Sequence, residues 1–212
     1  MPLFFQQQYP GAQVAVWHIT EGESFFAPYL PPLQHISHPR KRLQHAAGRF
    51  LLQHIEPRFP LAQIRVADTR KPYLPQHPFH FSISHCGDYA AVCISKIARV
   101  GVDIELVTPK MKRVQSKFCS ATEALVLQKW FSLQDEAEWL HAITLLWSGK
   151  EALFKWYSLG GVDFMRHMPL QELSPTDLKA YQSTIAFQKE RTQLVQVQSC
   201  FLDNLCLSFV VT

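Results

Sequence analysis

Three short apolar runs near the middle of the chain follow one another too closely for a helix to fit between them. Residues 79–85 and 89–95 read as strands, and the Gly87-Asp88 pair between them is typical of a hairpin turn. Residues 100–107 read as a third strand after a second short turn. Because parallel strands need a crossover of a dozen or more residues, this segment is expected to be antiparallel and not part of a βαβ series.

Apolar residues recur at helical spacing in two longer segments. Residues 40–55 have this pattern, and Pro57 is expected to end the helix. Residues 135–158 read as one long helix that ends at Gly160-Gly161. These two segments are expected to be the main helices of the fold.

Two further elements are predicted in the second half of the chain. Residues 122–131 predict a shorter helix, with Ser120 as its N-cap and Glu123 completing a capping box. The last residues read as a hairpin around Asp203-Asn204. No glycine-rich nucleotide fingerprint is present, so function must be sought in other motifs.

Each half of the chain then holds a helix and a strand hairpin, which hints at a duplicated lobe in a mixed α+β fold. We expect the lobes at residues 1–100 and 101–212. The first range holds ten Lys and Arg against five Asp and Glu, and the second holds eleven against twelve. The first lobe is therefore suited to an anionic partner.

Composition and cysteine content indicate a folded protein of a reducing compartment. Hydrophobic residues make up 47% of the chain and aromatic residues 12%, which argues against disorder. The five cysteines form no CxxC pair, and we interpret them as reduced. The short apolar start lacks the features of a signal peptide, and no apolar run approaches the roughly 18–20 residues that span a bilayer. A soluble cytoplasmic protein without a membrane partner is expected.

Two acidic residues, Asp103 and Glu105, stand two positions apart in the third predicted strand. Side chains at this spacing point to the same face of a strand. Paired carboxylates suit Mg²⁺, which takes one or two protein carboxylates and completes its shell with water and phosphate. On their own, two such acids are also common on a solvated strand face.

The long predicted helix carries Trp147, Glu151 and Lys155 at intervals of four, so these residues share one face. The simplest interpretation is an ion pair between Glu151 and Lys155. Lys150 lies beside this face and is expected to be solvated. Gly149 costs about 1 kcal/mol relative to alanine inside a helix, which suggests close approach of another group.

His85 ends the strand before the Gly-Asp turn, where it can bond a phosphate or serve as an ordinary turn residue. The chain also holds a basic run at residues 40–42. This run lacks the interleaved aromatic residues of a nucleic-acid site, so no nucleic-acid partner is expected. Two His-x-x-His pairs, at residues 35–38 and 77–80, lack nearby cysteines and argue against structural zinc.

Taken in order, these motifs resemble one family of enzymes. FSISHCGDYAAVCIS, GVDIELV, KFCSATE and WSGKEALFK are similar to four linked motifs of the 4′-phosphopantetheinyl transferases. Arg70-Lys71-Pro72 resembles their Gly-Lys-Pro loop, with arginine in place of glycine. The order and spacing are similar to the surfactin-synthetase-activating type, whose members are pseudo-dimeric single chains. The resemblance covers roughly residues 40–160.

The resemblance implies a role for each matching residue. The acids that match the metal ligands, with Mg²⁺ or Mn²⁺ as the ion, are Asp103, Glu105 and Glu151. The residues implied in catalysis are Glu151 as general base, Lys155 and Asp103. The residues implied in binding coenzyme A, whose phosphates Lys155 and His85 would contact, are Arg42, Arg49, Lys71, Ser84, His85 and Lys155.

The resemblance also implies the reaction and the architecture. The family moves the 4′-phosphopantetheine arm of coenzyme A onto a serine of an apo acyl or peptidyl carrier protein and releases 3′,5′-ADP. Its fold has two similar lobes related by pseudo-twofold symmetry, each a small antiparallel sheet packed with a long helix, with coenzyme A in the cleft between them. A monomer is expected.

Carrier proteins of this kind are acidic, so a basic and apolar docking surface is expected near the cleft. Residues 110–118, which hold four Lys and Arg and two large apolar residues, are predicted to form part of it. A mobile solvated loop is the alternative. Two other functions stay open at this stage: a metal-dependent phosphodiesterase with water as acceptor, and a non-catalytic protein that binds coenzyme A or a carrier.

Overall fold

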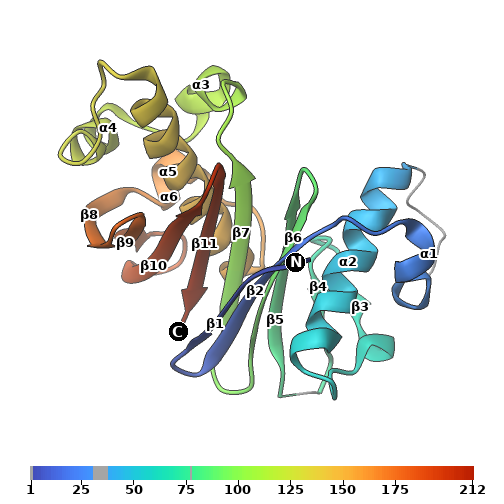
Figure 1. Cartoon of the computed structure of the whole chain (residues 1–212). Coiled ribbons are helices and arrows are strands. Elements are labelled where there is room, and N and C mark those ends of the chain that lie inside the picture. Colours follow the sequence, from blue (N-terminus) through green and yellow to red (C-terminus); the bar gives the residue numbers. More distant parts are fainter. Residues whose placement is uncertain (1, 31–37, 77) are drawn as a thin grey trace. The chain divides into compact units, whose positions relative to one another are not determined.

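The computed structural model describes residues 2–30, 38–76 and 78–212 (Figure 1). The backbone divides into two compact units. The first unit comprises Met1–Ile104 and Val211–Thr212, and the second comprises Glu105–Val210. Strand β7 (Val100–Leu106) begins in the first unit and ends in the second.

An antiparallel sheet with the strand order β1-β2-β6-β5 forms the body of the first unit. Its strands are β1 (Leu3–Tyr9), β2 (Ala12–His18), β5 (His80–Cys86) and β6 (Tyr89–Ser95). Helix α2 (Pro39–Ile55) packs along this sheet, against β2, β5 and β6 (Figure 1). The shorter elements of the unit are α1 (Glu23–Phe26), η1 (Ala27–Tyr29), η3 (Leu61–Gln63), β3 (Arg65–Val66) and β4 (Pro72–Tyr73).

Small residues let α2 lie close to the sheet. Ala46, Ala47 and Gly48 are buried on the helix, and the side chains of Leu51 and Leu52 complete its apolar face. This spacing of apolar residues is the pattern that predicted the helix, which the structure confirms.

The structure adds a strand that the sequence analysis did not predict. Strand β1 pairs with β2 along nearly its whole length. Its three glutamines, Gln6, Gln7 and Gln8, are exposed, as polar residues on an edge strand usually are. Three consecutive polar residues hide the alternation by which a strand is normally found.

The second unit is built on a sheet with the order β7-β11-β10-β9-β8. Its other strands are β8 (Leu170–Asp177), β9 (Ala180–Phe187), β10 (Gln193–Leu202) and β11 (Leu205–Val211). Helix α5 (Glu136–Tyr157) packs against β10. The shorter elements are α3 (Lys110–Val114), η4 (Gln115–Lys117), α4 (Ala121–Leu127) and α6 (Phe164–His167).

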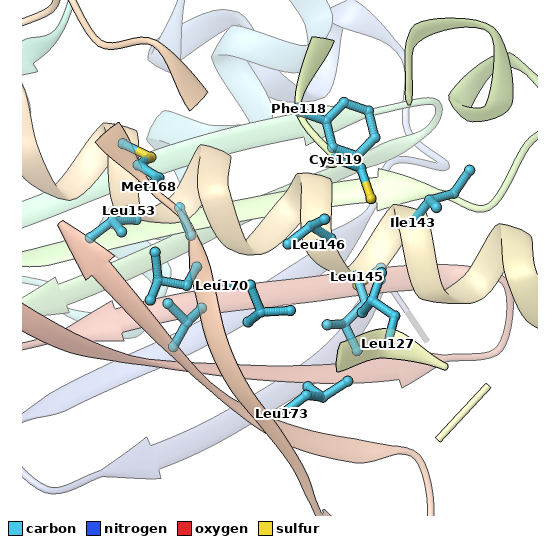
Figure 2. Close-up of a cluster of buried hydrophobic side chains, with 14 of the residues drawn as sticks. Phe118, Cys119, Leu127, Ile143, Leu145, Leu146, Leu153, Met168, Leu170 and Leu173 are labelled. Atoms are coloured by element: carbon cyan, nitrogen blue, oxygen red, sulfur yellow. The ribbon is translucent and has the colours of Figure 1, made fainter. Parts of the chain in front are cut away.

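Apolar side chains of α5 anchor the core of the second unit. Figure 2 shows Leu145, Leu146 and Leu153 of α5 in one cluster with Leu170 and Leu173 of β8, and all five side chains are buried. Burial of this apolar surface, at roughly 25 cal/mol per Å², is the main force that holds the helix on the sheet.

Both predicted helices of the second half have side-chain caps. Ser120 accepts a hydrogen bond from the Glu123 backbone N–H, and the Glu123 carboxylate accepts one from Ser120 N–H, which confirms the capping box. Asp135 caps α5 through the backbone N–H groups of its first turn. Helix α4 ends at Leu127 and so is shorter than predicted.

The α+β class is confirmed: the two larger sheets are antiparallel, and each is packed by one long helix. Strands β3 and β4 form a separate two-stranded sheet. The pseudo-twofold relation between the lobes stays a prediction. All five cysteines are free thiols. In the described parts of the chain, no helix combines the length and the apolarity needed to cross a membrane.

Candidate active site

In the first unit, Asp103 is held by a serine of the neighbouring strand β5. The Ser84 hydroxyl donates a hydrogen bond to Asp103 Oδ1 at 2.8 Å and accepts one from Ile104 N–H at 3.3 Å. Ser82 repeats the arrangement one pleat earlier, since its hydroxyl accepts from Val102 N–H at 3.0 Å. Asp103 is only 3% exposed, so it does not belong to an ordinary solvated strand face.

His85 follows Ser84 at the end of β5 and is half-buried. The turn after it is fixed by helix α2, because the Gln44 side-chain amide donates to the Gly87 carbonyl at 2.8 Å. The His45 ring of α2 meets the His85 ring edge to face at 5.1 Å. Partial burial, followed by the positive charges of Lys41 and Arg49, lowers the pKa of His45.

Two arginines proposed for coenzyme A binding make contacts within the first unit. Arg42 forms a two-pronged ion pair with Glu23, with N–O distances of 3.2 and 3.3 Å. Arg49 donates to the backbone carbonyls of Tyr29 at 3.0 Å and Leu61 at 3.1 Å, and so ties α2 to the short helices η1 and η3. The structure thus gives Arg49 a role in the fold, and its role toward a phosphate remains a prediction.

Lys71 lies in the loop before β4, where its carbonyl accepts a hydrogen bond from Ala67 N–H at 2.9 Å. The preceding residue, Arg70, has a φ of 64°, in the left-handed region that favours glycine. The glycine of the Gly-Lys-Pro pattern therefore suits this backbone, and arginine occupies the same conformation here. Lys71 itself is half-buried.

In the second unit, Glu105 lies against the face of α5 on which the proposed catalytic residues Glu151 and Lys155 were expected. The Trp147 indole N–H donates to Glu105 Oε1 at 3.1 Å. Since Trp147, Glu151 and Lys155 follow one another at single turns of α5, Glu105 lies beside the helix face that bears them. The side chains of all four residues are half-buried.

Lys150 differs from the expectation of a solvated side chain: it is fully buried. Its ammonium group pairs with the Glu123 carboxylate, which is 1% exposed, and donates to the carbonyls of Phe118 at 2.6 Å and Phe164 at 2.9 Å. Burial lowers the pKa of Lys150, and the charge of Glu123 opposes that shift. The prediction that Lys150 is solvated was wrong, because its ion-pair partner Glu123 lies on α4 and not on the same helix α5.

Phe118 and Phe164, whose carbonyls accept hydrogen bonds from Lys150, also contact Trp147 through their rings. The Trp147 ring lies 5.0 Å from the Phe118 ring and 5.4 Å from the Phe164 ring, measured between centroids. The buried ion pair, the two phenylalanines and Trp147 therefore form one connected support for Glu105. The sequence pattern predicts Glu123 as part of a helix cap but holds no signal for its pairing with Lys150.

The donor chemistry of the acidic residues fits a hard divalent cation. Asp103 and Glu105 each accept a hydrogen bond from a fixed side chain, as metal-ligating carboxylates commonly do. Among the residues that the structure describes, there is no cluster of three or more His, Cys, Asp or Glu side chains that could hold a metal ion. His35 and His77, of the two histidine pairs, lie outside the described residues.

Comparison with known proteins identifies the family. A family model described as the 4′-phosphopantetheinyl transferase superfamily matches residues 99–210. Enterobactin synthase component D of Salmonella austin is 30% identical over 171 residues, which cover 74% of this chain and 68% of that protein. The 4′-phosphopantetheinyl transferase psf-1 of Bacillus pumilus is 35% identical over 114 residues, covering 51% of this chain and 47% of that protein. The 4′-phosphopantetheinyl transferase AcpT of Escherichia coli (strain K12) is 32% identical over 124 residues, covering 54% and 57%.

The family model covers more than half of the chain, which therefore belongs to the 4′-phosphopantetheinyl transferase superfamily. The predictions of this family and of a phosphopantetheinyl transferase enzyme are thereby confirmed. The matched part of psf-1 and of AcpT is about half of each protein. The surfactin-synthetase-activating subtype stays a prediction, and so do the roles of the individual site residues.

Proposed function

We propose that this chain transfers the 4′-phosphopantetheine group of coenzyme A to a serine hydroxyl of an apo acyl or peptidyl carrier protein and releases 3′,5′-ADP. The observation that carries the proposal is the acidic strand β7. Both of its carboxylates are held by donors, Asp103 by Ser84 and Glu105 by Trp147. The same indole lies one helical turn before Glu151 and two before Lys155.

Asp103, Glu105 and Glu151 would hold the metal together with water and the coenzyme A phosphates, since no three such side chains form a ready cluster among the described residues. Mg²⁺ and Mn²⁺ both have the right preference for oxygen ligands. When bound, such an ion neutralises part of the negative charge of the coenzyme A pyrophosphate. The residues of the chain itself have to supply the proton acceptor and the fixed donors.

Glu151 accepts the proton of the carrier serine, directly or through one water molecule. The serine oxygen then forms a bond to the β-phosphorus, and the bond from that phosphorus to the bridging oxygen breaks. The electron pair stays with 3′,5′-ADP, whose growing charge Lys155 stabilises as a hydrogen-bond donor. His85 and Ser84 serve as further donors on the phosphates, and Arg42, Arg49 and Lys71 attract the 3′-phospho-ADP half.

The proposal extends to the organisation of the molecule. The larger sheet of each unit is antiparallel and is packed by one long helix, which supports the single-chain, pseudo-dimeric type. We propose that it acts as a monomer in the cytoplasm. The first hundred residues carry the excess of positive charge, which suits an anionic co-substrate.

The test is the intact mass of an apo acyl carrier protein after incubation with the full chain, MgCl₂ and coenzyme A. A gain equal to one phosphopantetheine group is expected, with the carrier serine as the modified residue in peptide mapping. Glu151→Gln is expected to lower the rate by about 10²–10⁴-fold, the usual contribution of a general base. Lys155→Ala is expected to lower kcat, while Glu172→Gln, an exposed carboxylate on β8, leaves the rate unchanged.

Two results would contradict the proposal. Release of 3′,5′-ADP without modification of several different carriers would instead support a metal-dependent phosphodiesterase. Saturable binding of coenzyme A without either product would support a non-catalytic binding protein.

A further inference from the structure

The second unit has a cavity that shares no residue with the proposed active site. Its volume is about 150 Å³, far above the roughly 10–15 Å³ that a single water molecule requires. The walls come from the segment before α5, the first turns of α5, and the two hairpin turns β8–β9 and β10–β11. A small organic group therefore fits in it.

Four aromatic rings line this cavity. Phe131 and Tyr181 lie 5.3 Å apart between ring centroids, and Tyr181 and Phe201 lie 6.2 Å apart. The His141 ring meets the Phe201 ring edge to face at 4.9 Å. His141 Nδ1 donates to the Ala137 carbonyl at 2.7 Å, so in the neutral ring Nε2 is an acceptor. Rings in contact of this kind present electron-rich faces and acceptors, which favour a cation.

The charged residues of the cavity are mostly acidic. Glu138 of α5 and Asp203 of the β10–β11 turn contribute carboxylates, against the single ammonium of Lys179 in the β8–β9 turn. Glu138 is oriented, because its Oε2 accepts a hydrogen bond from Ser132 N–H at 2.7 Å. Burial, followed by the negative charge of Glu138, raises the pKa of Tyr181, which places the Glu138 charge near that ring.

The hairpin turns that carry two of these charges have unusual backbone conformations. Lys179 has a φ of 140° and Asp203 a φ of 53°, both in the positive region that glycine prefers. The β8–β9 turn is joined to strand β10, since Phe201 N–H donates to the Lys179 carbonyl at 2.9 Å. This backbone hydrogen bond holds Lys179 and Phe201 of the cavity wall together.

We propose that this cavity binds an alkylammonium group, either primary or methylated. Three aromatic rings and a histidine surround the cation, and Glu138 and Asp203 provide the opposite charge. An anion would face two carboxylates and four ring systems, and a neutral apolar group would leave the carboxylates unused. The same chemistry is offered by a small free amine and by a lysine side chain, and the experiment distinguishes the two.

The test titrates the full chain with choline chloride and follows the ligand by saturation-transfer NMR. The matched neutral ligand is 3,3-dimethyl-1-butanol, in which a carbon atom replaces the nitrogen. Saturable binding of choline is expected, with binding of the alcohol at least tenfold weaker. A titration with Nα-acetyl-trimethyllysine amide then shows whether a side chain on a peptide backbone binds more tightly than choline does.

Variants locate the site. Glu138→Gln keeps the acceptor for Ser132 N–H but removes the charge, and it is expected to weaken choline binding at least fivefold. Lys179→Gln removes the opposing charge and is expected to strengthen it. Glu172→Gln, on β8 and outside the cavity, is the control and changes nothing.

Equal affinity for choline and the alcohol would overturn the proposal, because the cavity would then select apolar groups only. Absence of saturable choline binding, or binding that Glu138→Gln leaves unchanged, would overturn it as well. None of these outcomes depends on transferase activity, so the proposed function is tested separately.

Discussion

At the scale of single residues, two helix glycines that look alike in the sequence have different surroundings. A Cβ atom at Gly48 of α2 would lie 2.6 Å from Ile83 Cγ2 on β5, a distance that forces one of them to move. A Cβ atom at Gly149 of α5 would meet Val197 at 3.6 Å, an ordinary contact. The close approach inferred for Gly149 is therefore not tight, and the tight one occurs at Gly48.

Gly48→Ala is expected to lower the free energy of unfolding by about 1–3 kcal/mol, the usual cost of overpacking against a stiff side chain. The matched variant Gly149→Ala is expected to be neutral or to stabilise by up to about 1 kcal/mol, because alanine favours the helix. Urea unfolding of both variants checks this. Equal losses in both would show that the contact with Ile83 is not what makes glycine necessary.

The buried Lys150–Glu123 pair leads to a second residue-scale prediction. Lys150→Met leaves the Glu123 carboxylate uncompensated in the core, so a loss of about 3–5 kcal/mol of unfolding free energy is expected. The double variant Glu123→Gln with Lys150→Met removes both charges and is expected to recover part of that loss. Thermal unfolding followed by circular dichroism distinguishes them, and a double variant less stable than Lys150→Met would contradict this explanation.

At the scale of elements, α2, α5 and the hairpins β5–β6 and β10–β11 could be predicted because apolar spacing and turn residues agreed. Strand β1 was missed because its three consecutive exposed glutamines hide the alternation of apolar and polar residues. Strand β8 carries Pro175 and Asp177, which strands rarely contain, and it is an edge strand, where they are tolerated. Linked motifs predicted a set of site residues, and the roles of these residues stay a prediction. The burial of Lys150 could not be predicted, because its partner Glu123 lies on another helix and no local pattern reveals that the two pair.

The structure of residues 110–118, which include helix α3, changes the prediction that this segment forms a basic and apolar docking surface. In this segment Met111 and Phe118 are buried, so the apolar part of the predicted docking surface does not face a partner. Lys112 and Arg113 are exposed, and the pair of Lys112 with Glu136 at 2.9 Å is a surface ion pair of at most about 1 kcal/mol. The basic part of the segment remains available to an acidic carrier.

Lys112→Glu combined with Arg113→Glu is expected to raise KM for the apo carrier at least fivefold, with KM for coenzyme A changed less than twofold. The reason is repulsion between the introduced carboxylates and an acidic partner. Steady-state kinetics with each substrate varied separately measures the two values. Lys129→Glu, an exposed site beyond the end of α4, serves as the control for a simple change of net charge. Parallel increases in both KM values would remove α3 from the docking surface.

At the scale of the whole molecule, the basic residues and the acids that we propose as metal ligands are distributed unequally between the two units. The first hundred residues hold the excess of basic residues, and the second unit contains Glu105, Glu151 and Lys155. The proposed reaction needs both sets, since coenzyme A is an anion and its phosphates have to meet the acids through a cation. Long-range attraction by the basic residues then contributes to coenzyme A capture, and salt screens such attraction over a Debye length of about 10 Å at 0.1 M.

Raising NaCl from about 0.05 to 0.5 M is therefore expected to increase KM for coenzyme A several-fold, with a smaller change in kcat. Lys71→Gln is expected to raise KM at low salt and to flatten its salt dependence, since the charge that salt screens is already gone. Arg58→Gln, an exposed arginine outside the proposed site, keeps the parental slope. A slope that Lys71→Gln leaves unchanged would mean that Lys71 does not attract coenzyme A and serves the fold instead, as Arg49 does through its hydrogen bonds to the carbonyls of Tyr29 and Leu61.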